Sequence, residues 1–193
     1  MTGYVPAALP IEVVGTGAIF TRIHFATTLE PFFGPASGDR PSHRFHDPVG
    51  EFRVCFVGEN ETASFAETFL REPPVRLVTR DELSRRRVST LGLGRDLRLV
   101  SLHGPGLALL GCTAEITSSP SPYDEPQRLS RSLWQHGDRP DGIRYRCRHD
   151  DELFAIALFD RAVDALELLS TEDLLTDLTR LLRWSRRYGF AIG

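Results

Sequence analysis

The chain has 193 residues, a net charge of −3 and 41% hydrophobic residues. This length suits one compact domain, and the small net charge argues against a general polyanion-binding or membrane-surface role. All basic residues are arginines, which excludes mechanisms that need a lysine amine, such as a Schiff base or a P-loop. We therefore expect a single α+β or α/β domain over residues 1–193, with no direct contact to nucleic acid.

The cysteines and the N-terminal segment indicate the compartment. Cys55, Cys112 and Cys147 are odd in number and lack CxxC spacing, which disfavours a disulfide framework and a zinc knuckle. The first residues lack the basic and long apolar regions of a signal peptide, and no apolar run reaches transmembrane length. We expect a soluble, cytoplasmic protein.

The first half of the chain predicts two strands separated by a long loop. Residues 18–25 alternate as in a strand, which puts Arg22 and His24 on one face. Residues 26–48 are rich in Pro, Gly, Ser and Asp, and long ordered loops of this kind often bind ligands. Residues 52–57 predict a second, apolar strand.

A short helix is predicted after the turn at residues 58–60. Asn60 is a suitable N-cap, and Glu61 in the first turn favours the positive end of the helix dipole. On a helical wheel Glu67 lies at the edge of the apolar arc, beside alanines, where space remains for a ligand or for close packing. Pro73 and Pro74 end the helix.

The second half predicts further strands and helices. Strands are expected at residues 75–79, 88–93, 97–102, 143–145 and 153–159, and helical segments at 81–86, 105–110, 127–135 and 171–187. Asp81 is the expected cap of the helix at 81–86. Ser170 or Thr171 is expected to cap the last helix, which ends at Gly189.

Several isolated patterns suggest chemistry, but each has a simpler explanation. Gly15-Thr16-Gly17 resembles part of a dinucleotide-binding loop, yet Phe20 occupies the position of the third glycine, so a β-turn is favoured. Two groups contain possible metal ligands: His43, His46 and Asp47, and His149, Asp150 and Asp151. Neither has metal-site spacing, so we favour solvated loop residues and predict no metal.

Two further patterns leave alternatives open. Cys147 and His149 share a strand face at i and i+2, which permits a Cys-His nucleophile without specifying one. Glu67 and Arg71 stand at i and i+4, and by spacing alone a surface ion pair is favoured over a functional carboxylate.

An ordered set of segments carries a more specific indication. The segments are Arg22-Ile23, Arg44-Phe45 with Pro48, residues 54–57, residues 61–67, residues 142–148 and residues 157–160. In this order, over about residues 22–160, the chain resembles the RES domain family. The resemblance implies an α+β domain with an ADP-ribosyltransferase-like sheet core and flanking helices, its motif-bearing core lying at about residues 18–160.

The resemblance also implies the activity and the site residues. Many RES proteins are toxins that degrade NAD, and each is paired with an antitoxin that carries a helix-turn-helix domain and blocks the active-site cleft. Arg22 and Arg44 correspond to the family arginines and Glu67 to the family glutamate. Phe56 stands where a tyrosine is usual, and Cys147 stands where a serine is usual.

These residue types suit cleavage of the nicotinamide–ribose bond. A carboxylate at Glu67 can stabilise the oxocarbenium-like state, and Arg22 and Arg44 can bind the pyrophosphate of NAD. Phe56 keeps an aromatic face for nicotinamide, and Cys147 is a weaker donor than serine. The resemblance thus implies that Glu67, Arg22 and Arg44 are catalytic and that Arg22, Arg44, Phe56 and Cys147 bind NAD. We expect an NAD-cleaving toxin that uses water or phosphate as acceptor. The alternatives are a catalytically weakened or inactive domain that binds a nucleotide or a protein partner, and an ADP-ribosyltransferase acting on a macromolecule. Self-association into a homo-oligomer is left open.

Overall fold

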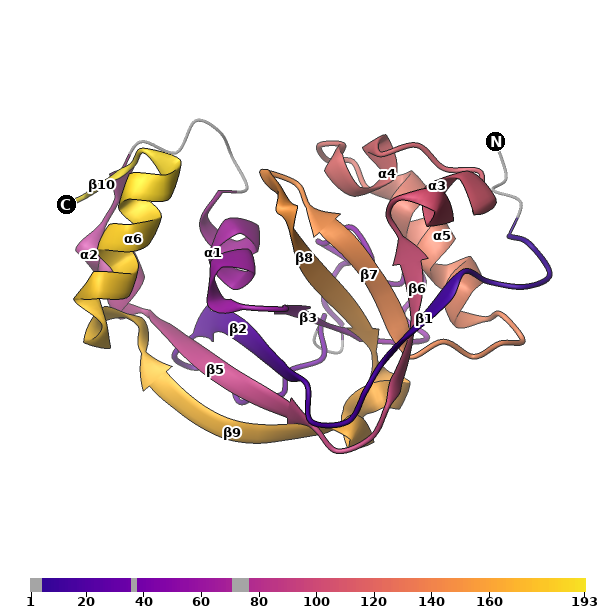
Figure 1. Ribbon diagram of the computed structural model, residues 1–193, viewed down its shortest axis with the longest axis horizontal. Coiled ribbons are helices and arrows are strands. Elements are labelled where there is room, and N and C mark those ends of the chain that lie inside the picture. Colours follow the sequence, from indigo (N-terminus) through magenta and orange to yellow (C-terminus); the bar gives the residue numbers. More distant parts are fainter. Residues whose placement is uncertain (1–4, 36–37, 71–76) are drawn as a thin grey trace.

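A computed structural model describes residues 5–35, 38–70 and 77–193 (Figure 1). Its centre is an eight-stranded sheet with the order β1-β6-β7-β8-β3-β2-β5-β9, in which β6 and β7 are parallel and the other neighbours are antiparallel. The strands are β1 Ile11–Val14, β2 Ile19–Phe25, β3 Val54–Gly58, β5 Arg86–Leu93, β6 Leu97–Leu102, β7 Gly142–Cys147, β8 Asp150–Phe159 and β9 Leu166–Asp173. Strands β4 (Leu77–Val78) and β10 (Ala191–Ile192) form a separate parallel pair.

Helices lie at both ends of the curved sheet and inside its concave face (Figure 1). They are α1 Glu61–Phe69, α2 Arg80–Ser84, α3 Pro105–Leu109, α4 Glu115–Ser118, α5 Asp124–Trp134 and α6 Leu178–Tyr188, with 3-10 turns η1 Asp160–Ala165 and η2 Leu174–Thr176. In Figure 1, helix α1 lies in the concavity, α6 and α2 lie at the left end of the molecule, and α3 to α5 lie at the right end near β6. The expected α+β class and single compact domain agree with this architecture.

Helix α1 begins as the sequence predicts and packs closely on β3. The Asn60 side chain accepts a hydrogen bond from the Ala63 N–H at 2.9 Å, so Asn60 is the N-cap. A Cβ added at Gly58 would lie 2.6 Å from the Ser64 nitrogen, so only glycine permits this approach. Phe65 stacks on Trp184 of α6 with ring centroids 4.5 Å apart, which fixes α1 between the sheet and α6.

The predicted start of the last helix is wrong. Residues that were expected to open that helix form β9, where Ser170 and Thr171 pair with Thr90 and Ser89 of β5. Helix α6 starts only at Leu178, and its N-cap is Asp177. The leucine spacing resembles a longer helix, but pairing with a distant strand prevails over local propensity. The predicted end at Gly189 is confirmed by its left-handed φ of 68°.

Smaller differences concern other helix boundaries. Thr79 caps α2 by accepting from the Glu82 N–H, whereas Asp81 lies within the first turn. Helix α5 starts at Asp124, earlier than the predicted residue 127. The predicted helix stop at Pro73 and Pro74, the start of the strand at 75–79 and the pairing of Glu67 with Arg71 lie outside the described residues.

Candidate active site

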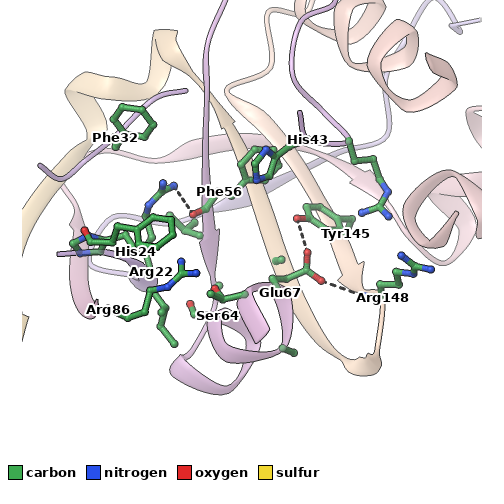
Figure 2. Close-up of a pocket in the computed structure, with 18 of the residues that line it drawn as sticks. Arg22, His24, Phe32, His43, Phe56, Ser64, Glu67, Arg86, Tyr145 and Arg148 are labelled. Carbon is green, nitrogen blue, oxygen red and sulfur yellow. Dashed lines mark hydrogen bonds between the residues drawn. The ribbon is translucent and has the colours of Figure 1, made fainter. Parts of the chain in front are cut away.

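A pocket of about 510 Å³ opens where strands β2 and β3 diverge. Strand β2 pairs with β5 at seven positions, but it pairs with β3 only through Thr21 and Gly58. Beyond this pair the two strands separate, and residues of both line the pocket together with α1 and the β7–β8 hairpin. The lining therefore comes from segments that lie far apart in the sequence (Figure 2).

Glu67 of α1 presents its carboxylate to this pocket and is held by two donors. The Arg148 N–H donates to Oε1 at 3.1 Å, and the Tyr145 O–H donates to Oε2 at 3.3 Å (Figure 2). Both donors belong to β7 and the turn that follows it. Because two groups fix the carboxylate, Glu67 is oriented within the pocket.

Tyr145 is a site residue that the sequence interpretation missed. Its side chain is buried, and its ring meets Phe45 edge to face at 5.0 Å. Burial, followed by the negative charge of Glu67, raises the pKa of Tyr145 well above its ordinary value. Tyr145 therefore keeps its proton and acts as a hydrogen-bond donor toward Glu67.

Cys147 lies beside Glu67 but not in the lining of the pocket. It is 1% exposed, and burial followed by the charge of Glu67 raises the pKa of its thiol. A thiol is a poor nucleophile while it keeps its proton, so these surroundings disfavour the Cys147–His149 nucleophile. Cys147 contributes to the surroundings of Glu67, whereas His149 itself lines the pocket.

Arg22 lies at the point where β2 and β3 separate. Its Nη1 donates to the Phe56 carbonyl at 3.0 Å, and its Nε donates to Glu30 Oε1 at 2.9 Å. The Phe56 carbonyl belongs to the part of β3 that does not pair with β2. The Arg22 guanidinium therefore supplies the hydrogen bond that this carbonyl does not receive from β2. The Arg22 side chain is 16% exposed and reaches the pocket.

Arg44 comes from the long loop, which helix α5 anchors. Gln127 donates to the His43 carbonyl at 3.0 Å, and Ser130 donates to the Phe45 carbonyl at 2.8 Å, so both neighbours of Arg44 are fixed. The Arg44 Nη2 donates to the Ser119 carbonyl at 2.9 Å. Burial lowers the pKa of Arg44, whereas the charge of the nearby Glu67 opposes this shift.

Aromatic rings form one wall of the pocket. The Phe56 ring centroid lies 5.4 Å from that of His43 and 5.5 Å from that of His46. The His43 and His46 centroids are 4.7 Å apart. Phe56 and His43 line the pocket, so a planar ligand can meet an aromatic face there.

Two of the possible metal ligands, Asp47 and Asp150, have structural roles, whereas His43 and His149 line the pocket. Asp47 is buried and accepts hydrogen bonds from Arg131 Nη1 at 3.0 Å and from the Phe52 N–H. Asp150 accepts a hydrogen bond from the Tyr188 O–H at 2.7 Å. The expectation of solvated residues is therefore wrong for Asp47 and His46, which are buried. Within the described part of the chain no group of three or more His, Cys, Asp or Glu side chains is arranged for a metal ion.

Comparison with known proteins identifies the family. The family model described as RES domain matches residues 19–179. The chain belongs to the RES domain family. It is 31% identical over 102 residues to the probable toxin y4kH of Sinorhizobium fredii (strain NBRC 101917 / NGR234), an alignment that covers 53% of this chain and 76% of that protein.

A solved structure shows the same fold. The chain superimposes on one from the crystal structure of the M. tuberculosis MbcT–MbcA toxin–antitoxin complex with a TM-score of 0.64 and 14% sequence identity. The superposition covers 83% of this chain and 86% of that chain, which confirms the expected RES-type fold. None of the helices in the described residues has the length and apolar character needed to cross a bilayer.

Four of the five residues assigned from the RES pattern line the pocket around Glu67. These four are Arg22, Arg44, Phe56 and Glu67, whereas Cys147 lies outside the lining. The sequence interpretation did not assign His24, Arg86, Tyr145 and Arg148, which also line the pocket. Tyr145 could have been found, because it shares a strand face with Cys147 in the GIRYRC segment.

The cationic side chains lie on both sides of Glu67. Figure 2 shows Arg22 and Arg86 on one side of the carboxylate and Arg148 on the other. The Arg86 guanidinium stacks on Phe25, 3.7 Å from the ring centroid, and the cation and ring together form part of the pocket lining. A ligand that carries negative charge would therefore meet arginines at either end of the pocket.

Proposed function

We propose that this RES domain is an NAD-degrading enzyme that cleaves the bond between nicotinamide and ribose. The observation that carries the proposal is the geometry around Glu67. Its carboxylate is held by the Arg148 N–H and the Tyr145 O–H, within a pocket that Arg22 and Arg44 also line. A pocket of about 510 Å³ is of the size that binds small molecules and cofactors.

The chemistry of the bond explains the need for a fixed carboxylate. Departure of nicotinamide leaves positive charge on the ribose, as in glycoside hydrolysis. A carboxylate that is already oriented stabilises this charge without reorganisation during the reaction. Glu67 supplies the charge, and Tyr145 and Arg148 supply the orientation. Water or phosphate then adds to the ribose carbon.

The remaining groups suit the rest of NAD. Arg22 and Arg44 present permanently charged, planar guanidinium groups, which can bind the pyrophosphate through paired hydrogen bonds. The Phe56 ring with His43 offers an aromatic face for the nicotinamide ring. The assignment of Arg22, Arg44 and Glu67 as catalytic residues follows from the family pattern and agrees with this placement.

A toxin role and an antitoxin partner form part of the same proposal. The similar proteins are described as a probable toxin and as part of a toxin–antitoxin complex. By the family pattern, the antitoxin would carry a helix-turn-helix domain and cover the pocket. Co-expression with a small helix-turn-helix protein encoded next to this one should relieve growth arrest, whereas unrelieved arrest would count against this pair.

One specific observation favours a second candidate, a domain that binds NAD without turnover. Phe56 lacks the hydroxyl that is usual at its position, and Cys147 replaces the usual serine beside the carboxylate. If these departures abolish turnover, calorimetry will detect NAD binding while no nicotinamide is released. Faster release by Cys147→Ser would instead identify a weakened enzyme.

The decisive experiment compares nicotinamide release by the wild-type protein and by Glu67→Gln. The amide keeps the size of the side chain but removes the charge that stabilises the ribose cation, so we expect a rate lower by about 10²-fold or more. Glu61→Gln is the matched control, since Glu61 lies on the same helix but pairs with Arg180 outside the pocket.

The possible outcomes separate the hypotheses. Near wild-type rates for Glu61→Gln with a large loss for Glu67→Gln support the proposed enzyme. Equal rates for wild type and Glu67→Gln would refute the role of the carboxylate. Incorporation of label from NAD into macromolecules, instead of free ADP-ribose or its phosphate, would indicate an ADP-ribosyltransferase.

A further inference from the structure

Glu30 is a buried carboxylate that the family pattern does not assign. It lies in the loop after β2, and its side chain is 1% exposed. Its Oε1 accepts from Arg22 Nε at 2.9 Å, and its Oε2 accepts from the Phe32 N–H at 3.1 Å. A buried charge is stable only when it is paired and hydrogen-bonded, and Arg22 supplies the opposite charge.

Glu30 and β3 together hold the Arg22 guanidinium from two sides. Glu30 binds Nε, and the Phe56 carbonyl binds Nη1 at 3.0 Å. Within the described residues Nη2 makes no hydrogen bond, so this nitrogen is available to a ligand in the pocket. A free arginine side chain would lose rotamer freedom on binding an anion, but this one is already ordered.

His24 also lies near Glu30 but does not replace Arg22 as its partner. The His24 Nδ1 is 3.7 Å from Glu30 Oε1 and bonds the Phe25 carbonyl at 2.9 Å. Its Nε2 is 2.8 Å from the Ser89 hydroxyl. Both ring nitrogens thus have closer partners, and burial holds the pKa of His24 below its ordinary value. Arg22 is therefore the main ion-pair partner of Glu30.

We propose that Glu30 is the positioning residue that holds Arg22 ready for the anionic group of the substrate. Glu30 does not touch the substrate; it fixes the guanidinium at the opening between β2 and β3. The identity of that anion as the pyrophosphate of NAD rests on the proposed function. The positioning itself is a property of the free protein and can be tested without turnover.

The variant Glu30→Gln tests this arrangement. A carboxylate offers acceptors to both Nε of Arg22 and the Phe32 N–H, whereas an amide has one acceptor oxygen and turns its NH₂ group toward the other donor. We expect KM for NAD to rise about tenfold, the effect of one charge-assisted hydrogen bond, with kcat changed by less than about threefold. Asp141→Asn is the control, because Asp141 pairs with Arg95 outside the pocket.

A double-mutant cycle distinguishes positioning from general destabilisation. When Arg22 is already replaced by alanine, adding Glu30→Gln should leave KM within about twofold of the Arg22→Ala value, since the residue that Glu30 positions is gone. A tenfold rise in KM in both backgrounds would overturn the proposal. If Glu30→Gln does not fold, Glu30→Asp takes its place, because it keeps the buried charge but withdraws it by one methylene. Unchanged KM in Glu30→Asp would then overturn the proposal.

A second measurement works even if the protein does not cleave NAD. Phenylglyoxal modifies accessible arginines, and mass spectrometry locates the modified residue. We expect Arg22 to be modified about tenfold faster in Glu30→Gln than in wild type, and at the wild-type rate in Asp141→Asn. Absence of nicotinamide release by wild type would refute the proposed function alone. Equal labelling of Arg22 in wild type and Glu30→Gln would refute its positioning by Glu30.

Discussion

Replacement of Tyr145 by phenylalanine tests the role of the hydrogen bonds around Glu67. The substitution removes one oxygen and keeps the ring that packs on Phe45. Hydrogen bonds to charged groups contribute about 1.5–3 kcal/mol, and the 3.3 Å distance to Oε2 places this one near the lower end. A loss of about 1.5 kcal/mol corresponds to about a tenfold change in rate.

The location of the hydroxyl predicts which kinetic constant changes. The Arg148 N–H still holds Oε1 at 3.1 Å, so the carboxylate stays in the pocket but is free to rotate about this anchor. We therefore expect kcat for nicotinamide release to fall about tenfold while KM stays within about twofold. The free energy of unfolding should fall by about 1 kcal/mol, as measured with urea.

A matched substitution provides the control for this prediction. Tyr188→Phe also removes a hydroxyl that donates to a carboxylate, that of Asp150 at 2.7 Å, but Tyr188 does not line the pocket. Its kcat should remain that of wild type. A wild-type kcat for Tyr145→Phe, or equal losses in the two variants, would refute the role assigned to Tyr145.

Two further predictions concern His24 and the cysteines. Burial holds the pKa of His24 below its ordinary value of 6.5, so the stability that its neutral ring provides is complete above about pH 6.5 and is lost as the pH falls through the lower folded-state pKa. Urea unfolding between about pH 7.5 and about pH 5 should show this loss, and His24→Gln should reduce it; an equal loss in both proteins would contradict the assignment. Burial raises the pKa of all three cysteines, but Cys55 and Cys147 are buried whereas Cys112 is partly exposed, so iodoacetamide should alkylate Cys112 first in the native protein. Rapid native alkylation of Cys147 would restore it as a candidate nucleophile.

Local patterns predicted the elements that depend on local interactions. Asn60 as the N-cap, the apolar strand around residues 153–159 and the end of α6 at Gly189 were all read correctly from short segments. Strand β9 was missed because its order comes from pairing with β5, about 80 residues earlier in the chain, as in the Ser89–Thr171 contact. No local periodicity encodes such a partner.

The site shows the same division between local and distant information. The spacing placed Arg22 on a strand and Glu67 at the edge of the apolar arc of a helix, and both line the pocket. The partners of Glu67 come from Tyr145 and Arg148, 78 and 81 residues further along the chain, so helical spacing alone favoured the neighbouring Arg71. The divergence of β2 from β3 that opens the pocket has no counterpart in the pattern of either strand.

The two departures from the family pattern affect different parts of the site. Phe56 keeps its ring in contact with His43, so the aromatic wall remains although a hydroxyl is absent. Cys147 is buried near Glu67, and the two hydrogen-bond donors that hold the Glu67 carboxylate come from Tyr145 and the Arg148 backbone. Neither of these hydrogen bonds involves the side chain of Phe56 or Cys147. The fixed carboxylate and its flanking arginines therefore favour the proposed enzyme over a domain that only binds NAD.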